Sequence, residues 1–193
     1  ILLLPGSRIK SIEMIAPIIL DSFQRISAKD DSLMGVILYP SQKVKLFLET
    51  ILDSYPTLAD KISLQRNDSG KLKVKGAIMS SGTISLSMAL AAVPGVIMYT
   101  FSKLNYWLLR RLIKVRFIGL ANLILDQNIY PELLDDKANA DNVIESFTPY
   151  LQEKETLDNF IDASNLLKSK LLEEREMSAS EWIESQISKS ENV

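Results

Sequence analysis

Residues 79–100 read MSSGTISLSMALAAVPGVIMYT and predict a complete strand–helix–strand unit. A short apolar run leads into a Ser-Ser-Gly-Thr junction, a helix of small residues follows, and a Pro-Gly pair opens a second apolar run. Apolar strands joined by a helix are typical of a parallel sheet that is covered on both faces. The stretch therefore favours an α/β fold. It also raises the question of whether the junction only turns the chain or holds a phosphate.

The same alternation of apolar runs and helical patterns continues on both sides of this unit. We predict strands over residues 1–4, 34–39, 61–65, 77–80 and 95–99. We predict helices over residues 11–27, 42–54, 83–92 and 102–113, and Pro17 should kink the first helix or reset its start. From residue 141 onward the pattern is purely helical, with one apolar face made by Leu157, Phe160, Ile161, Leu167 and Leu171.

Composition limits the chemistry that this chain can perform. Its 193 residues can bury one substantial core, and a net charge of -2 gives no overall field that would attract nucleic acid. The sequence contains no Cys and no His, which excludes thiol nucleophiles, disulfides, Cys/His zinc sites and an imidazole base within this chain. No apolar run reaches the roughly 18 to 20 residues of a membrane-spanning helix. Residues 1–4 already form a complete buried-strand run, so we interpret the chain as a domain cut from a longer polypeptide.

Gly6, Ser7 and Arg8 form the first candidate ligand-binding loop, directly after a predicted strand. In open α/β sheets ligands collect at the carboxyl ends of strands, where helix N-termini offer free N–H groups. The glycine allows close approach of a ligand, the serine offers a hydroxyl, and the guanidinium can grip a phosphate. An ordinary turn with a solvated arginine would explain the same residues.

The junction Ser80, Ser81, Gly82 and Thr83 repeats this geometry after a later predicted strand. Hydroxyls and glycine amides at a helix start suit a phosphate, although Ser or Thr is also simply a good N-cap. Because both loops follow strands of one sheet, they can face a single crevice. Together they predict a diphosphate or nucleotide-sugar site.

Residues 101–117 read FSKLNYWLLRRLIKVRF, with five cations, no acid and a broad apolar stripe. Such a helix suits the surface of an anionic membrane, and it equally suits a sheet-covering helix with solvated cations. The side chains that would contact a membrane are Tyr106, Trp107, Arg110, Arg111, Lys114 and Arg116.

Asn122 and Glu132 lie in the expected loop region LANLILDQNIYPELLDD, residues 120–136. An amide and a carboxylate could bind sugar or ribose hydroxyls. Glu132 after Pro131 is equally suited to the first turn of a helix, where it would face the helix dipole. From the residues alone we favour a structural role.

The ordered series LPGSR, SSGT, the strand ending at Tyr99, YWLLRRLIKVRFIGLANLIL and YPELL resembles the C-terminal half of the lipid-A-disaccharide synthase family. The similarity runs from about Leu2 to about Leu134. It implies a Rossmann-like, nucleotide-sugar-binding lobe of a GT-B glycosyltransferase over residues 1–150 and a helical tail over 151–193. The N-terminal lobe, which carries the acceptor site and the proposed base, would be absent from this chain.

The resemblance implies transfer of a diacylglucosamine from UDP-2,3-diacylglucosamine to lipid X, an acylated glucosamine 1-phosphate. This half alone should not catalyse. Arg8 would stabilise the leaving UDP, and no metal or other cofactor is expected.

The implied partners are an anionic membrane surface, the missing lobe and a second copy in a homodimer, with no nucleic acid. The implied location is cytoplasmic, peripheral to the inner membrane of a Gram-negative bacterium. The implied UDP contacts are Gly6, Ser7, Arg8, Ser81, Gly82, Thr83, Tyr99, Asn122 and Glu132.

Four positions depart from the family pattern, at Ser87, Thr100, Ala121 and Asp135, where the family usually has Glu, Lys or Arg, Pro and Gln. These departures support a second hypothesis, a non-catalytic scaffold or binding domain that keeps the fold. A third hypothesis, another UDP-sugar enzyme such as an epimerase, is disfavoured because it would not need the basic aromatic helix.

Overall fold

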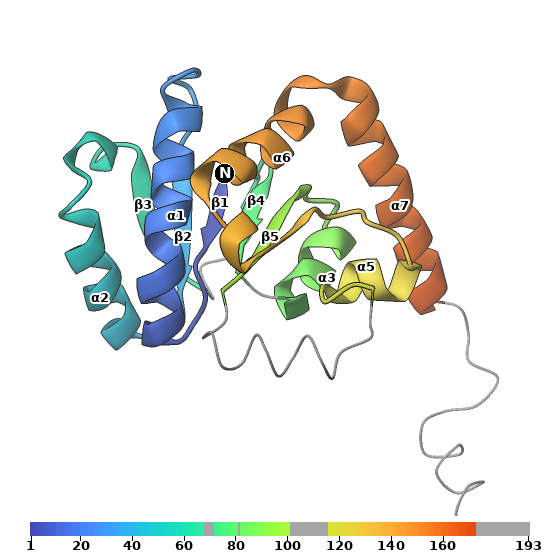
Figure 1. Cartoon of the computed structure of the whole chain (residues 1–193), viewed down its shortest axis with the longest axis horizontal. Helices are drawn as coiled ribbons and strands as arrows, with labels where there is room; N and C mark the ends of the chain where they lie inside the picture. Colours follow the sequence, from blue (N-terminus) through green and yellow to red (C-terminus); the bar gives the residue numbers. More distant parts are fainter. Residues whose placement is uncertain (68–71, 81, 101–115, 173–193) are drawn as a thin grey trace, which may run out of the picture.

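A computed structural model describes residues 1–67, 72–80, 82–100 and 116–172 (Figure 1). Within these residues six parallel strands form one sheet in the order β3-β2-β1-β4-β5-β6. The strands are β1 (Leu2–Leu4), β2 (Gly35–Tyr39), β3 (Ile62–Arg66), β4 (Ala77–Met79), β5 (Gly95–Tyr99) and β6 (Glu132–Leu134). The helices are α1 (Ile9–Ser27), α2 (Gln42–Leu52), α3 (Gly82–Leu90), α5 (Leu120–Leu125), α6 (Ala140–Gln152) and α7 (Lys154–Leu172), with short 3-10 turns η1 (Pro56–Leu58) and η2 (Asp135–Lys137).

The predicted fold class, a Rossmann-like parallel sheet flanked by helices with a helical C-terminal stretch, is confirmed. Each predicted strand coincides with one of β1 to β5 to within one residue. The helix expected over residues 102–113 lies outside the described residues. The sheet contains one further strand, β6, that was not predicted. β6 pairs with β5, and Ile97 is in register with Glu132.

The chain order reverses beside β1, which lies between β2 and β4. Leu3 is in register with Ile37 on one side and with Ile78 on the other. In doubly wound folds the crevice for ligands opens at this reversal, above the carboxyl ends of the strands. The topology therefore places the loops after β1 and β4 next to each other.

Alternate strand residues pack into two separate cores, one on each face of the sheet. Leu3, Ile37 and Ile78 pack against α1, α2 and α6, whereas Leu4 and Met79 pack against α3, α5 and α7. Figure 1 shows these two helical layers on opposite faces of the sheet. Because β1 is buried on both faces, all three of its residues can be leucine.

Helix α1 runs from Ile9 to Ser27 with Pro17 inside it. The alternative that Pro17 resets the start of this helix is therefore wrong, since α1 begins eight residues before the proline. Apolar residues along one side of the helix bury against the sheet, including Ile12, Ile15 and Phe23, which are at most 1% exposed. This burial outweighs the hydrogen bond that a proline removes.

The last described helix, α7, contributes to the second core through Phe160 and Leu167. Both residues belong to the predicted apolar face. Leu171, which was expected on that face, is instead 43% exposed. Ser164, which was not expected on that face, is fully buried. Of the helices in the described ranges, none has both the length and the apolar character needed to cross a membrane.

Gly95 marks the tightest packing between neighbouring strands. A Cβ atom at this position would lie 2.1 Å from the carbonyl oxygen of Ala77 on β4. Real Cβ atoms do not approach a backbone oxygen so closely, and a backbone oxygen cannot move aside as a side chain does. Gly95, the second residue of the Pro-Gly pair, is thus needed for the β4–β5 pairing itself.

Candidate functional site

The loops that leave β1 and β4 touch at Gly6 and Ser80. Leu4 and Met79 are register partners, and the backbone N–H of Ser80 donates to the carbonyl of Leu4 at 3.0 Å. Gly6 has a φ of 109°, which side-chain-bearing residues rarely adopt. A Cβ there would lie 3.1 Å from Ser80 Oγ and 3.4 Å from Ser11 Oγ. Both conformation and space therefore require a glycine, as expected for a loop that a ligand approaches closely.

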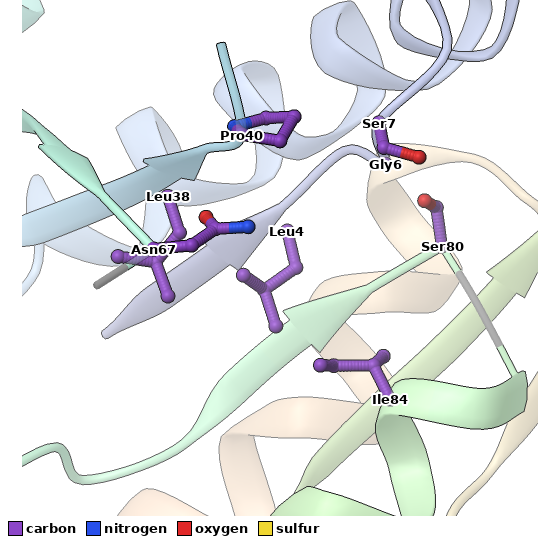
Figure 2. A pocket seen from close by; sticks show the side chains of 8 residues that line it. All are labelled: Leu4, Gly6, Ser7, Leu38, Pro40, Asn67, Ser80 and Ile84. Carbon is purple, nitrogen blue, oxygen red and sulfur yellow. The ribbon is translucent and has the colours of Figure 1, made fainter.

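A cavity of about 320 Å³ opens beside this contact, at the carboxyl ends of β1, β2 and β4 (Figure 2). Its volume falls at the lower end of the range for small-molecule sites. Apolar side chains form most of the wall, and a few polar groups come from the loops. The lining residues are Leu4, Gly6, Ser7, Leu38, Pro40, Asn67, Ser80 and Ile84.

The hydroxyl of Ser80 is buried and has no hydrogen-bond partner among the described residues. Figure 2 shows it pointing toward the turn at Gly6 and Ser7. A buried hydroxyl without a partner costs about 1 to 3 kcal/mol. Such groups are rare in folded proteins, and one at the wall of a cavity is a candidate for satisfaction by a ligand.

Within the described ranges, three helices begin at this edge of the sheet: α1 after β1, α2 after β2 and α3 after β4. None of them carries an acidic residue in its first turn. Arg8 occupies the N-cap position of α1, where its side chain makes no capping hydrogen bond and is exposed. Free N–H groups, positive dipole ends and an exposed guanidinium all favour an anion here.

Most of the predicted diphosphate contacts converge at this edge. Gly6 and Ser7 line the cavity, Arg8 follows them, and Gly82 and Thr83 begin α3. Ser81 lies outside the described residues. Ser80, the first residue of the predicted Ser-Ser-Gly-Thr junction, also lines the cavity, and so does Asn67, which the sequence did not single out as a ligand contact.

Asn122 and Glu132, by contrast, bind each other. Asn122 is fully buried, its Nδ2 donates to Glu132 Oε1 at 2.8 Å, and its side chain also pairs with both backbone polar groups of Tyr130, at 2.7 and 2.9 Å. The Glu132 carboxylate accepts from the backbone N–H groups of Ile118 and Gly119, each at 2.9 Å. The pair thus fastens the start of α5 to β6, and neither residue lines the cavity.

Two expectations about this pair are corrected. Glu132 is the first residue of a strand, β6, and not part of a helical first turn. Asn122 lies within α5 and not in a loop. The physical reason is that β6 is paired to β5, which fixes extended backbone after Pro131. The structural role favoured from the residues alone agrees with these hydrogen bonds.

Tyr99 ends β5 near this pair. Burial, followed by the charge of Glu132, raises the pKa of Tyr99 far above its usual range, so the phenol stays protonated. Tyr99 does not line the cavity between the loops of β1 and β4. Tyr99, Asn122 and Glu132 are therefore not among the residues that line the cavity beside the Gly6–Ser80 contact.

A protein-family model described as "Lipid-A-disaccharide synthetase" matches residues 1–187. The chain belongs to this family. Similar curated proteins include the lipid-A-disaccharide synthase of Geobacter sulfurreducens, 35% identical over 159 residues, and that of Nitrosococcus oceani, 28% identical over 169 residues. The first alignment covers 78% of this chain and 39% of the relative, and the second covers 88% and 43%. The chain thus spans less than half the length of these synthases.

Among the positions that depart from the synthase family pattern, Ser87 lies exposed on α3 and Asp135 begins η2 with a φ of 47°. Neither lines the cavity. Within the described ranges no three acidic side chains gather closely enough to hold a metal ion.

Of the six side chains expected at a membrane, only Arg116 lies within the described residues. Its guanidinium is 5.0 Å from the centre of the Phe117 ring and 3.8 Å from the Asp126 carboxylate, and its side chain is 73% exposed. The residues of this prediction outside the described ranges are Tyr106, Trp107, Arg110, Arg111 and Lys114.

Proposed function

We propose that this chain is the nucleotide-binding lobe of a lipid-A-disaccharide synthase. In the whole protein it would hold UDP-2,3-diacylglucosamine while the diacylglucosamine is transferred to lipid X. One observation carries the proposal: in a chain of this family, two glycine- and hydroxyl-bearing loops meet at Gly6 and Ser80 beside a cavity of about 320 Å³.

The charges at the carboxyl edge match the demands of this transfer. As the glycosidic bond forms, negative charge grows on the departing UDP, and groups placed to meet that charge lower the barrier. Arg8 would supply a cation, and the starts of α1 and α3 would supply N–H groups. The acceptor and the general base would come from the part of the synthase that this chain does not span. No metal or other cofactor enters the proposal.

We infer that the full synthase works at the cytoplasmic surface of the inner membrane of a Gram-negative bacterium. The basic, aromatic sequence 101–117 supports this inference, because such segments bind anionic lipid surfaces. The exposed Arg116 is the described part of this segment that could face lipid. Leu166, Leu171 and Leu172 are exposed on α7 and would support a homodimer contact.

The test is a titration of UDP into the isotopically labelled 193-residue chain, followed through backbone amide resonances. We expect saturable shifts clustered at Gly6 to Arg8 and at the start of α3, and weaker binding by the variant Arg8→Ala. Arg116→Ala is the matched control, since it removes an exposed arginine that does not line the cavity. No shifts at millimolar UDP, or shifts spread evenly over the chain, would contradict the proposal.

A non-catalytic domain that keeps the fold is the second candidate function. The internal hydrogen bonds of Asn122 and Glu132 favour it, because they occupy two residues that the resemblance assigns to the donor. The same titration separates the two candidates, since a domain that has lost its donor site would not bind UDP saturably.

A further inference from the structure

We infer that Asn67 selects the nucleotide base by forming hydrogen bonds with its polar edge. This inference rests on the proposed function, which supplies a UDP donor, and it adds a specificity residue that neither the sequence motifs nor the family resemblance points to. The argument uses the position of Asn67, the partners of its side chain and the chemistry of the cavity.

Asn67 follows directly after β3 and is held there by its backbone. Its N–H donates to the carbonyl of Tyr39 on β2 at 3.2 Å, which continues the pairing of the two strands by one residue. The side-chain carboxamide makes no hydrogen bond within the described residues. Figure 2 shows it pointing from the end of β3 toward Leu4, over the cavity. A fixed backbone thus presents to the cavity an amide that has no hydrogen-bond partner within the described ranges.

The cavity is polar at two separate places and apolar between them. Ser7 and Ser80 stand where β1 and β4 end, whereas Asn67 stands where β3 ends. At ordinary strand spacing the end of β3 lies about 10 Å from the end of β1 and about 14 Å from the end of β4, because β2 lies between β3 and β1. Leu4, Leu38 and other apolar residues lie between them. A nucleoside diphosphate has this same order of parts: an anionic end, a linking sugar and a flat base with a polar edge.

The carboxamide suits the edge of uracil. Uracil presents an N–H donor flanked by carbonyl acceptors, and a carboxamide presents a donor and an acceptor side by side, so two parallel hydrogen bonds can form. Apolar walls suit the two faces of the ring. The small volume of the cavity favours a pyrimidine over a purine, which would otherwise also accept a carboxamide.

The experiment compares UDP, ADP, pyrophosphate and UDP methylated at N3 of the base, with affinities measured by calorimetry or amide shifts. The variant Asn67→Leu keeps the side-chain shape and removes both hydrogen-bonding groups. Asn67 is exposed, so the substitution should not disturb folding, which thermal unfolding checks. Asn159→Leu is the matched control, because Asn159 is an exposed asparagine on α7 that does not line this cavity.

Asn67→Leu should bind UDP about tenfold more weakly than the wild type, the loss expected for two neutral hydrogen bonds. It should bind pyrophosphate unchanged, and methylation of N3 should weaken binding to the wild type but not to Asn67→Leu. Asn159→Leu should match the wild type throughout.

Three outcomes overturn the inference, and they can be told apart. If wild type and Asn67→Leu bind UDP equally, Asn67 does not contact the base, although the proposed function stands. If the wild type binds ADP more tightly than UDP, the cavity does not select a pyrimidine. If the wild type does not bind UDP at all, the proposed function fails and the inference fails with it.

Discussion

Asn122 and Glu132, ten residues apart in sequence, are joined by a hydrogen bond of 2.8 Å between Nδ2 and Oε1. The same two side chains bind the backbone of Tyr130, Ile118 and Gly119. Through this arrangement a helix of six residues, too short to be stable alone, is attached to the edge strand of the sheet.

Replacing Asn122 should therefore cost stability and not only affinity. Asn122→Ala leaves two backbone groups of Tyr130 without their partner, and we expect a loss of about 3 kcal/mol in the free energy of unfolding. Urea unfolding measures this loss. Asn159→Ala, which replaces an exposed asparagine on α7, should change the free energy by less than about 0.5 kcal/mol. Equal stability of the two variants would show that the internal hydrogen bonds of Asn122 contribute nothing to the free energy of unfolding.

Ser80 and Ser164 each carry a buried hydroxyl that has no hydrogen-bond partner among the residues the structure describes, so they provide a matched pair. Removing either by substitution with alanine should raise the free energy of unfolding of the ligand-free chain by about 1 kcal/mol, since an unsatisfied buried group is lost. Only Ser80→Ala should also weaken UDP binding, because only Ser80 lines the cavity. Thermal unfolding with and without UDP tests both statements. A variant Ser80→Ala that binds UDP like the wild type would remove Ser80 from the site.

Gly95→Ala should destabilise the fold strongly, although it adds only one methyl group. Its Cβ would meet a backbone oxygen at 2.1 Å, so β4 and β5 would have to separate, and we expect a loss of more than about 3 kcal/mol or failure to fold. Gly35→Ala is the control, because a Cβ there meets only side-chain atoms, at 3.0 to 3.1 Å. Those side chains can shift, so its cost should be nearer 1 kcal/mol. Circular dichroism during urea unfolding compares the two variants.

Stability should fall at alkaline pH, in part through Tyr150. Burial raises the pKa of Tyr150 to about 12, whereas in the unfolded chain it stays near 10. Between these values the unfolded state releases the proton and the folded state keeps it, so raising the pH favours unfolding. The shift corresponds to about 2 to 3 kcal/mol by pH 12.

Tyr150→Phe tests this assignment, because it removes the titrating group and leaves the ring. It also loses the hydrogen bond from the phenol to the carbonyl of Ile129 at 3.0 Å, so its stability at neutral pH should be slightly lower. The decisive quantity is the slope of unfolding free energy against pH between 10 and 12, which should be shallower than in the wild type. An unchanged slope would assign the alkaline loss to other groups.

The sequence predicted β1 to β5 well and missed β6, the strand at one edge of the sheet. Apolar runs such as 95–99 have one physical explanation, burial on both faces, and five strands were placed to within one residue. β6 was missed because it has only three residues, begins with Glu132 and follows a proline. Such a strand exists only through pairing with β5, and pairing between distant segments leaves no local pattern.

The same limit applies to the candidate site. Gly6 and Ser7 could be found because a glycine and a hydroxyl between a strand and a helix have a chemical meaning of their own. Asn67 could not be found this way, since it belongs to a polar stretch that reads as a turn. Only the strand order, which brings the end of β3 to the same cavity as the end of β1, gives this asparagine a chemical role.

The absence of acidic residues from the first turns of α1, α2 and α3 affects how quickly a nucleotide would arrive. The chain is weakly acidic overall, with a net charge of -2, yet one edge presents three helix N-termini and the exposed Arg8. An approaching diphosphate would be repelled weakly at long range and attracted close to that edge. Added salt shortens the reach of both forces to about 10 Å at 0.1 M. Ionic strength would then change the rate of encounter more than the lifetime of the bound state.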